Sequence, residues 1–362
     1  MVLMAIDHVR VYSGVPAGGP TPGVFFTRWV THFCAPGFVF FAGTSAYLLG
    51  QKVGRPALSR YLLTRGLLLV VLELTIIRAS WTFGFDYSQF LLAGVIWMLG
   101  WCMVLLAGLV HVPARVLGIV GLIVIAAQNV FGALGGMLPQ AIHPFWELIY
   151  PVGAELRLGQ GGPSVTVLYT IVPWIGVMCV GYAFGLVMTL PSDERRKWCV
   201  RTGLIATTVF LVVGGLMVAM QAAPQGAPPA LIRLLNQRKY PASPLFLLMT
   251  LGPTIALLPL AERAHGWFAS MMTTFGRVPM FYYLLHIPLI HATALLVWLM
   301  RDGAAHPERF ASAPYVSIPA DQRWSLALLY LVWAAVVAIL YPLCVWYART
   351  KARRPESWLR YL

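Results

Sequence analysis

Apolar stretches of about 20 residues recur along this chain of 362 residues, and they limit its fold more than any other feature. Hydrophobic residues make up 59% of the chain and charged residues 10%, whereas a soluble domain carries about 25% charged residues. Stretches of this length fit membrane helices rather than barrel strands, because a helix pairs all of its own backbone groups. We therefore predict an all-α polytopic membrane protein that forms one transmembrane domain over residues 1–362.

Clusters of glycine, proline and charge separate the apolar stretches. Before the first full stretch, Met1–Ile6 is apolar but would span roughly 9 Å as a helix, against a bilayer core of about 30 Å. We read it as a partial first span, left by a misassigned start or buried as a half-span among other helices. About nine full transmembrane helices follow, near residues 26–50, 60–80, 89–110, 115–135, 165–190, 202–221, 243–262, 275–300 and 324–348.

The basic residues predict an orientation in the membrane. The linker 51–65 carries four cations and no acid, and the segments 191–201 and 349–362 are also basic. If the spans alternate, these segments share one side, which the positive-inside rule makes cytoplasmic, together with the C-terminus. The net charge of +14 is thus a topology signal, and no nucleic-acid partner is expected. Five scattered cysteines without a Cys/His cluster indicate neither a disulfide framework nor a metal site.

Four ionisable residues gather at the predicted outer face, and they are the first candidates for chemistry. Asp7 and His8 end the first span, while Arg28 and His32 open the next. Such groups are costly at membrane depth and usually face a cavity or a partner. Each histidine could simply anchor a helix end, but two with Asp7 and Arg28 favour a functional cluster. Histidine suits general-base work, and a carboxylate can orient it. Neighbours on a helix point about 100° apart, which disfavours a direct Asp7–His8 pair, so a pair of Asp7 with His32 across the two helices is an alternative.

Further polar candidates lie in later spans. Glu73 and Arg78 are five residues apart, which is not a facing pair, so each is expected to find a partner on another helix, with a structural ion pair as the alternative. Tyr282, Tyr283 and His286 precede a proline that removes a backbone hydrogen bond. These three residues either line a cavity, or the histidine is a core residue that is hydrogen-bonded to a carbonyl.

The motifs together resemble one bacterial family. Met4–Arg10, the run from Thr27 to Ser45, and Tyr283–His286 are similar to the DUF1624 group, which resembles the catalytic domain of heparan-alpha-glucosaminide N-acetyltransferase among the transmembrane acyltransferases. The resemblance implies a protein of the bacterial inner membrane. It would pass an acetyl group from cytoplasmic acetyl-CoA to an amino or hydroxyl group of a sugar or glycan on the far side.

The resemblance also implies roles for the candidate residues. His32 or His8 would be the general base, with His32 slightly ahead, and Asp7 would orient it. Substrate contacts would come from Arg28, Glu73, Arg78, Tyr282, Tyr283 and His286. The phosphates of coenzyme A would bind cations on the cytoplasmic side. The positive-inside rule alone also explains these cations, which are Lys52, Arg55, Arg60, Arg65 and Arg277.

This chain departs from the family pattern in two respects. Such families usually start with an Arg/Asp/Arg-Gly pattern before and within the first span, and this chain lacks that part. The second departure concerns the catalytic histidine. The lysosomal enzyme has a catalytic histidine between its first two conserved spans, whereas the loop Val11–Phe25 has none, and His32 stands where that enzyme has an acidic residue. A transporter or flippase of a sugar or lipid-linked substrate is the alternative function. Inverted repeats would favour it, and none is evident. The sequence leaves undecided whether the protein forms a homodimer. The predicted partners are the lipid bilayer, acyl-CoA and the sugar acceptor.

Overall fold

The computed structural model describes residues 1–19, 21–88, 90–150, 155–157, 159, 162–223 and 225–354. They fall into two compact units. The first unit takes in Met1–Cys34, Thr75–Asp86 and Ala264–Leu362, and the second takes in Ala35–Leu74 and Tyr87–Arg263. The prediction of a single domain over 1–362 stays a prediction.

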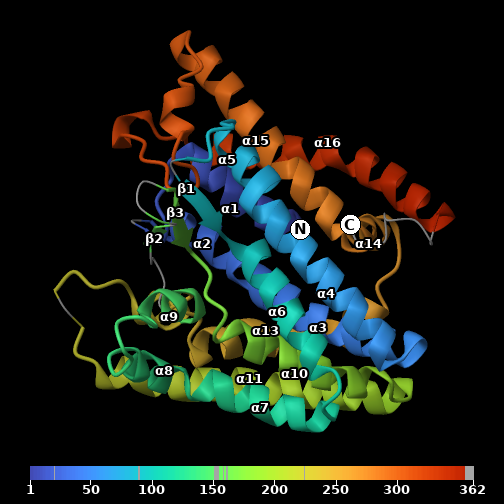
Figure 1. The fold of residues 1–362 in the computed structure, drawn as a ribbon. Helices are drawn as coiled ribbons and strands as arrows, with labels where there is room; N and C mark the ends of the chain where they lie inside the picture. The colour runs from blue at the N-terminus through green and yellow to red at the C-terminus, as the bar shows by residue number, and fades with distance from the viewer. Residues whose placement is uncertain are drawn as a thin grey trace. The chain divides into compact units, whose positions relative to one another are not determined.

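The first unit is built on three helices that contact one another. Helix α1 (Val2–Ser13) packs against both α15 (Pro279–Asp302) and α16 (Leu326–Arg353), as Figure 1 shows. Hydrogen bonds fix both ends of α1: the Trp333 indole donates to the Val2 carbonyl at 2.9 Å, and the Trp324 backbone N–H donates to the Ser13 carbonyl at 3.1 Å. The remaining elements are α2 (Pro22–Trp29), η1 (Val30–Phe33), α5 (Arg78–Thr82), α14 (Trp267–Arg277), η3 (Pro307–Phe310) and η4 (Ala320–Gln322).

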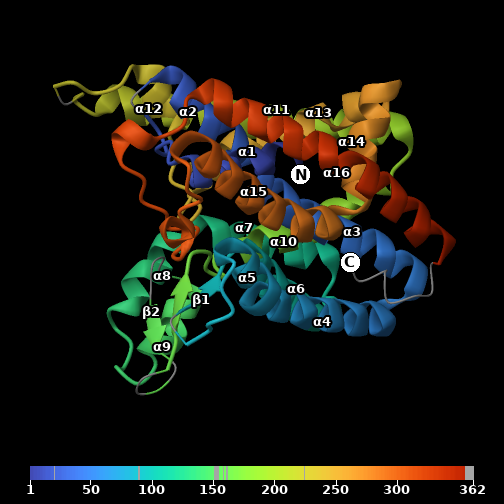
Figure 2. The same ribbon diagram turned by 90° about the horizontal axis from the view of Figure 1, so that it is seen from above.

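The second unit is made of helix pairs. Three pairs pack closely, α4 with α6, α7 with α10, and α11 with α13, and Figure 2 shows α4 lying along α6. Its helices are α3 (Cys34–Val53), α4 (Arg55–Leu72), α6 (Val95–Leu109), α7 (Ala114–Ala126), α8 (Gln128–Gly135), α9 (His143–Ile149), α10 (Trp174–Met188), α11 (Ser192–Met220), α12 (Ala230–Leu235) and α13 (Pro244–Glu262). Helix α4 continues as the π-helix η2 (Glu73–Ile77).

Glycines allow the helices of each pair to approach backbone to backbone. A Cβ atom at Gly66 would lie 2.6 Å from the carbonyl oxygen of Gly100, and a Cβ at Gly121 would lie 2.6 Å from that of Gly176. Small residues at helix crossings are typical of membrane proteins, where close packing replaces the hydrophobic effect between helices. The apolar helices of the second unit therefore pack closely at their glycines.

A small sheet belongs to the second unit and was not predicted. Strands β1 (Phe90–Ala93), β3 (Ser164–Val167) and β2 (Glu155–Arg157) lie in the order β1-β3-β2. β1 is parallel to β3 with Phe90 opposite Ser164, and β2 is antiparallel to β3 with Glu155 opposite Thr166. The predicted spans 89–110 and 165–190 start at β1 and β3, so each loses its first turns to a strand.

Five of the predicted spans are confirmed as helices long and apolar enough to cross a membrane. They run over Pro22–Val53, Ser192–Met220, Pro244–Glu262, Pro279–Asp302 and Leu326–Arg353. The first is one continuous helical segment made of α2, η1 and α3, and the fourth continues through Pro288 without ending. The all-α membrane class is therefore confirmed for the described part of the chain.

The count of nine full spans is not confirmed. Helices α7 and α8 would give a sixth span only as a pair bent by 58°. Helices α6 and α10 have 15 residues each, or about 22 Å, which falls short of a bilayer core of about 30 Å. Helix α4 carries three arginines, and it is not among the helices that are long and apolar enough to cross a membrane. The cytoplasmic placement of the C-terminus, which depends on the count, stays a prediction.

Candidate active site

Two histidines from opposite ends of the sequence meet in the first unit. His8 lies on α1 and His286 on α15, and the Nδ1 atom of His8 is 2.6 Å from the Nε2 atom of His286. Their ring planes are inclined by only 23°, and the ring centroids are 4.8 Å apart. The centroid separation exceeds the nitrogen separation by about two ring radii, so the two rings lie edge to edge with the nitrogens facing each other.

The second nitrogen of His286 is held by the backbone of its own helix. Nδ1 of His286 lies 2.7 Å from the carbonyl oxygen of Tyr283 and 3.1 Å from that of Tyr282. The His286 side chain has no exposed surface, whereas His8 is half-buried. Of the two, His8 is the one that a molecule from outside can reach.

Aromatic rings surround the histidine pair. Tyr282 stacks on His286 at a centroid distance of 5.2 Å, and Tyr283 meets His286 edge-on at 5.1 Å. Trp81 packs edge-on against His8 at 4.9 Å. Tyr282 is fully buried, and its hydroxyl has no hydrogen-bond partner among the described residues. These rings fix the orientation of both imidazoles and exclude water from the side of His286.

A second buried histidine on α15 belongs to a different cluster. His291 stacks on Phe83 at 3.9 Å and lies 5.0 Å from Tyr12 and 5.3 Å from Phe310, between ring centroids. Tyr12 in turn donates a hydrogen bond to the carbonyl of Trp81 at 2.6 Å. This cluster ties α1, α5 and η3 to α15 and is built for packing.

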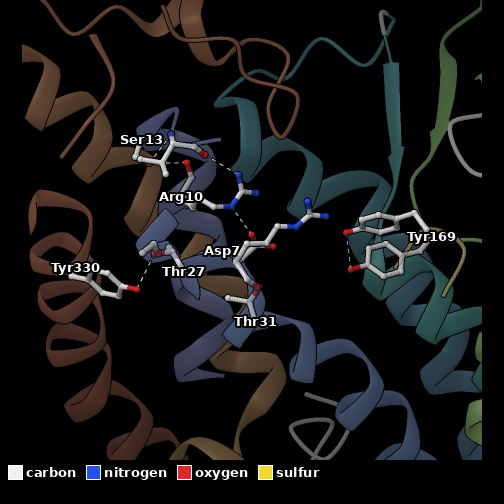
Figure 3. A network of polar contacts seen from close by, with 11 residues as sticks. Asp7, Arg10, Ser13, Thr27, Thr31, Tyr169 and Tyr330 are labelled. Atoms are coloured by element: carbon white, nitrogen blue, oxygen red, sulfur yellow. Dashed lines mark hydrogen bonds and ion pairs between the residues drawn. The ribbon is translucent and has the colours of Figure 1, made fainter. Parts of the chain in front are cut away.

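The other outer-face candidates lie on the same unit. Nε of Arg10 donates to Oδ1 of Asp7 at 2.9 Å, and Figure 3 shows the guanidinium folded over the carboxylate. His32 is 3% exposed and lies on η1, which packs against α1. Arg28 is half-buried on α2, a helix that the Thr27 hydroxyl links to Tyr330 at 3.0 Å, also drawn in Figure 3.

Glu73 and Arg78 have separate structural tasks. In the second unit, Oε2 of Glu73 accepts a hydrogen bond from the backbone N–H of Ile96 at 3.0 Å, so this buried carboxyl caps the start of α6. In the first unit, the Arg78 guanidinium donates to the carbonyls of Gly84 at 2.8 Å and Asp86 at 2.6 Å. Glu73 therefore has a partner on another helix, whereas Arg78 binds carbonyls of the turn that follows its own helix.

The predicted coenzyme A cations divide between the units. Lys52, Arg55 and Arg60 are exposed around the turn between α3 and α4, and Arg55 donates to the His111 carbonyl at 3.1 Å. Arg65 is half-buried and donates to the Tyr61 hydroxyl at 2.7 Å. Arg277, exposed at the end of α14, belongs to the other unit.

Comparison with known proteins decides the family. A family model described as heparan-alpha-glucosaminide N-acetyltransferase, catalytic, matches residues 1–220, more than half of the chain. The chain belongs to this family. No curated protein and no solved structure matches it.

Membership in the heparan-alpha-glucosaminide N-acetyltransferase catalytic family confirms the resemblance drawn from the sequence. It makes the chain an integral membrane protein of an acyltransferase family whose donor in general is acetyl-CoA. The matched region includes His8, Arg28 and His32, whereas Tyr282, Tyr283 and His286 lie beyond it.

The sequence missed Trp81, which packs against His8, and Tyr12, which belongs to the neighbouring packing cluster and donates a hydrogen bond to the Trp81 carbonyl. Tyr12 follows His8 by four residues and therefore shares its helix face, a signal that could have been read. Trp81 lies on α5, and nothing in its local sequence pointed to His8.

Proposed function

We propose that the protein transfers an acetyl or other acyl group from cytoplasmic acyl-CoA to an amino or hydroxyl group of a sugar or glycan outside the cytoplasm. One observation carries the proposal: in a member of an acetyltransferase family, His8 and His286 meet at 2.6 Å although 278 residues separate them. Placing two imidazoles side by side within apolar segments is costly unless the pair has a task, and histidine is the common general base near neutral pH.

His8 is the better candidate for the base. It is half-buried and contacts a second imidazole, whereas the His32 side chain is 3% exposed. An acceptor amine or hydroxyl must come within hydrogen-bond reach of the base, so partial exposure favours His8. This reverses the slight preference for His32 drawn from the sequence. Asp7, paired with Arg10, would set the charge beside the site rather than orient the base.

The proposed reaction is direct transfer. His8 takes the proton of the acceptor N–H or O–H as the acceptor attacks the thioester carbonyl carbon. A C–N or C–O bond forms and the C–S bond breaks, and the proton passes from His8 to the coenzyme A sulfur. Arg28 is proposed to hold the acceptor, and Tyr282 and Tyr283 to flank the acyl group. Removing a general base of this kind lowers the rate by roughly 10²–10⁴-fold.

The donor would bind at the cationic turn between α3 and α4. Lys52, Arg55 and Arg60 are exposed there, and Lys and Arg recognise the phosphates of coenzyme A. Arg65 is proposed as a further contact in the same unit, while the role of Arg277, which belongs to the other unit, stays a prediction from the sequence. The positive-inside rule favours a cytoplasmic location for this turn and for the C-terminus, and the proposed membrane is a bacterial inner membrane.

The test is acetyl transfer by purified protein in nanodiscs, with labelled acetyl-CoA and glucosamine-type acceptors that offer an amine or only hydroxyls. We expect a labelled acceptor with the wild type, and loss of that product in His8→Ala and in the double variant His8→Ala, His32→Ala. His265→Ala is the matched control because His265 is exposed in the same unit, between α13 and α14.

Three outcomes would count against the proposal. Full activity of the double variant would show that neither histidine is needed for the reaction. Absence of product with every acyl-CoA tested would refute acyl transfer. Movement of sugar across the membrane of vesicles would support a transporter instead. Label on the amine acceptor alone would assign N-acetylation, and label on the hydroxyl acceptor would assign O-acetylation.

A further inference from the structure

We infer that His286 is a positioning residue that fixes the tautomer of His8 and leaves Nε2 of His8 as the basic nitrogen. The inference rests on the proposed function only for what that nitrogen does in catalysis. The proton positions themselves follow from hydrogen-bond chemistry in the first unit.

The first step concerns His286 alone. Its Nδ1 atom faces the carbonyl oxygens of Tyr283 and Tyr282, at 2.7 and 3.1 Å. A carbonyl oxygen can only accept a hydrogen bond, so Nδ1 must carry the proton. In a neutral imidazole the other nitrogen then has a free lone pair. The backbone of α15 therefore makes Nε2 of His286 an acceptor.

The tautomer of His286 in turn determines the tautomer of His8. Nε2 of His286 lies 2.6 Å from Nδ1 of His8, with the rings edge to edge. Two lone pairs at this distance would repel, so Nδ1 of His8 must donate. Its own Nε2 is then unprotonated. When Nε2 of His8 takes a proton from an acceptor, its Nδ1–H keeps the same hydrogen bond, which steadies the imidazolium.

The third step is rigidity. His286 has no exposed surface, and Tyr282 stacks on one face of it while Tyr283 meets it edge-on. Trp81 and Tyr283 flank His8. A residue that only orients the base must be held in one rotamer, and these rings hold it. In serine hydrolases a buried carboxylate performs this task; here a second neutral imidazole, anchored by its own helix, would do so.

The test reads the tautomer directly. In protein with ¹⁵N-labelled histidine, the eight histidines give ring nitrogen signals that separate protonated from unprotonated nitrogens. The His8 signals are identified by their loss in His8→Gln. We expect Nδ1 of His8 to be protonated and Nε2 to be unprotonated in the wild type at a pH where His8 is neutral. The opposite assignment would overturn the inference.

Variants at His286 separate positioning from packing. His286→Gln keeps an acceptor oxygen for Nδ1 of His8, whereas His286→Leu removes it at a similar volume. We expect the glutamine variant to retain the His8 tautomer and most of the kcat. The leucine variant should mix the tautomers and lower kcat roughly 10²-fold or more, with KM for acetyl-CoA unchanged. His291→Leu is the control, because His291 is also buried on α15 but belongs to the packing cluster.

The two proposals can fail separately. The expected tautomer in a protein without acetyl transfer would refute the proposed function and keep the positioning of His8. Acetyl transfer with equal kcat in His286→Leu and His286→Gln would refute the positioning role and keep the function.

Discussion

Substituting Gly43 by alanine tests how tightly the helices of the second unit pack. A Cβ atom at this position of α3 would overlap the carbonyl oxygen of Met178 and lie 2.7 Å from the backbone nitrogen of Tyr182. Ordinary contact begins at 3.4 Å, so the second distance is 0.7 Å too short, and both obstacles are backbone atoms of α10. No rotamer change relieves this clash, and the two helices must move apart.

Gly37 on the same helix provides the matched control. A Cβ atom there would meet nothing within 4 Å. Both substitutions gain about 0.5–1 kcal/mol from replacing a helical glycine by alanine. Only Gly43→Ala also has the cost of overpacking, about 1–3 kcal/mol. The difference between the two variants therefore isolates the helix contact.

Thermal unfolding in detergent or nanodiscs, followed by tryptophan fluorescence, measures this difference. One kcal/mol corresponds to about 2–4 °C of Tm in a domain of roughly 150–250 residues. We expect Gly37→Ala to unfold at or above the wild-type Tm and Gly43→Ala to unfold several degrees below Gly37→Ala. Equal Tm values for the two variants would refute the close approach of α3 and α10.

The remaining predictions concern the two buried ionisable residues with structural tasks. Glu73→Ala leaves the backbone N–H of Ile96 without its acceptor and should lower the free energy of unfolding by about 1–3 kcal/mol, whereas Glu73→Gln keeps an acceptor and should lose less. Denaturant titration compares the two, and equal losses would contradict the capping role. Arg78→Met removes both donors to the Gly84 and Asp86 carbonyls and should speed proteolytic cleavage of this turn, while Arg78→Lys retains part of the protection. Unchanged cleavage in Arg78→Met would show that the turn holds without the guanidinium.

The long spans could be predicted because their signal is local. Segments such as Pro244–Glu262 and Leu326–Arg353 are apolar over a full bilayer width, and a window along the sequence finds them. The sheet could not be predicted in this way. Phe90–Ala93 is apolar and runs into the apolar helix α6, and only Gly94 separates them, so a strand and the first turn of a span look alike.

The site was predictable residue by residue but not as an arrangement. His8 and His286 each stood out because an ionisable group in an apolar segment is costly wherever it lies. Their contact joins α1 to α15 across 278 residues, and no local pattern encodes it. The pairing of Asp7 with Arg10 was readable, since residues three apart face each other on a helix. The predicted partners of Asp7 were the histidines instead.

The proposed role of His8 as the base of a membrane acyl transfer can be measured by kinetics. The initial rate of acetyl transfer from labelled acetyl-CoA is compared between wild type, His8→Ala and His265→Ala, each reconstituted and matched for Tm. We predict that His8→Ala lowers kcat/KM by roughly 10²–10⁴-fold and that His265→Ala leaves it unchanged. A wild-type rate in folded His8→Ala would show that His8 is not the base.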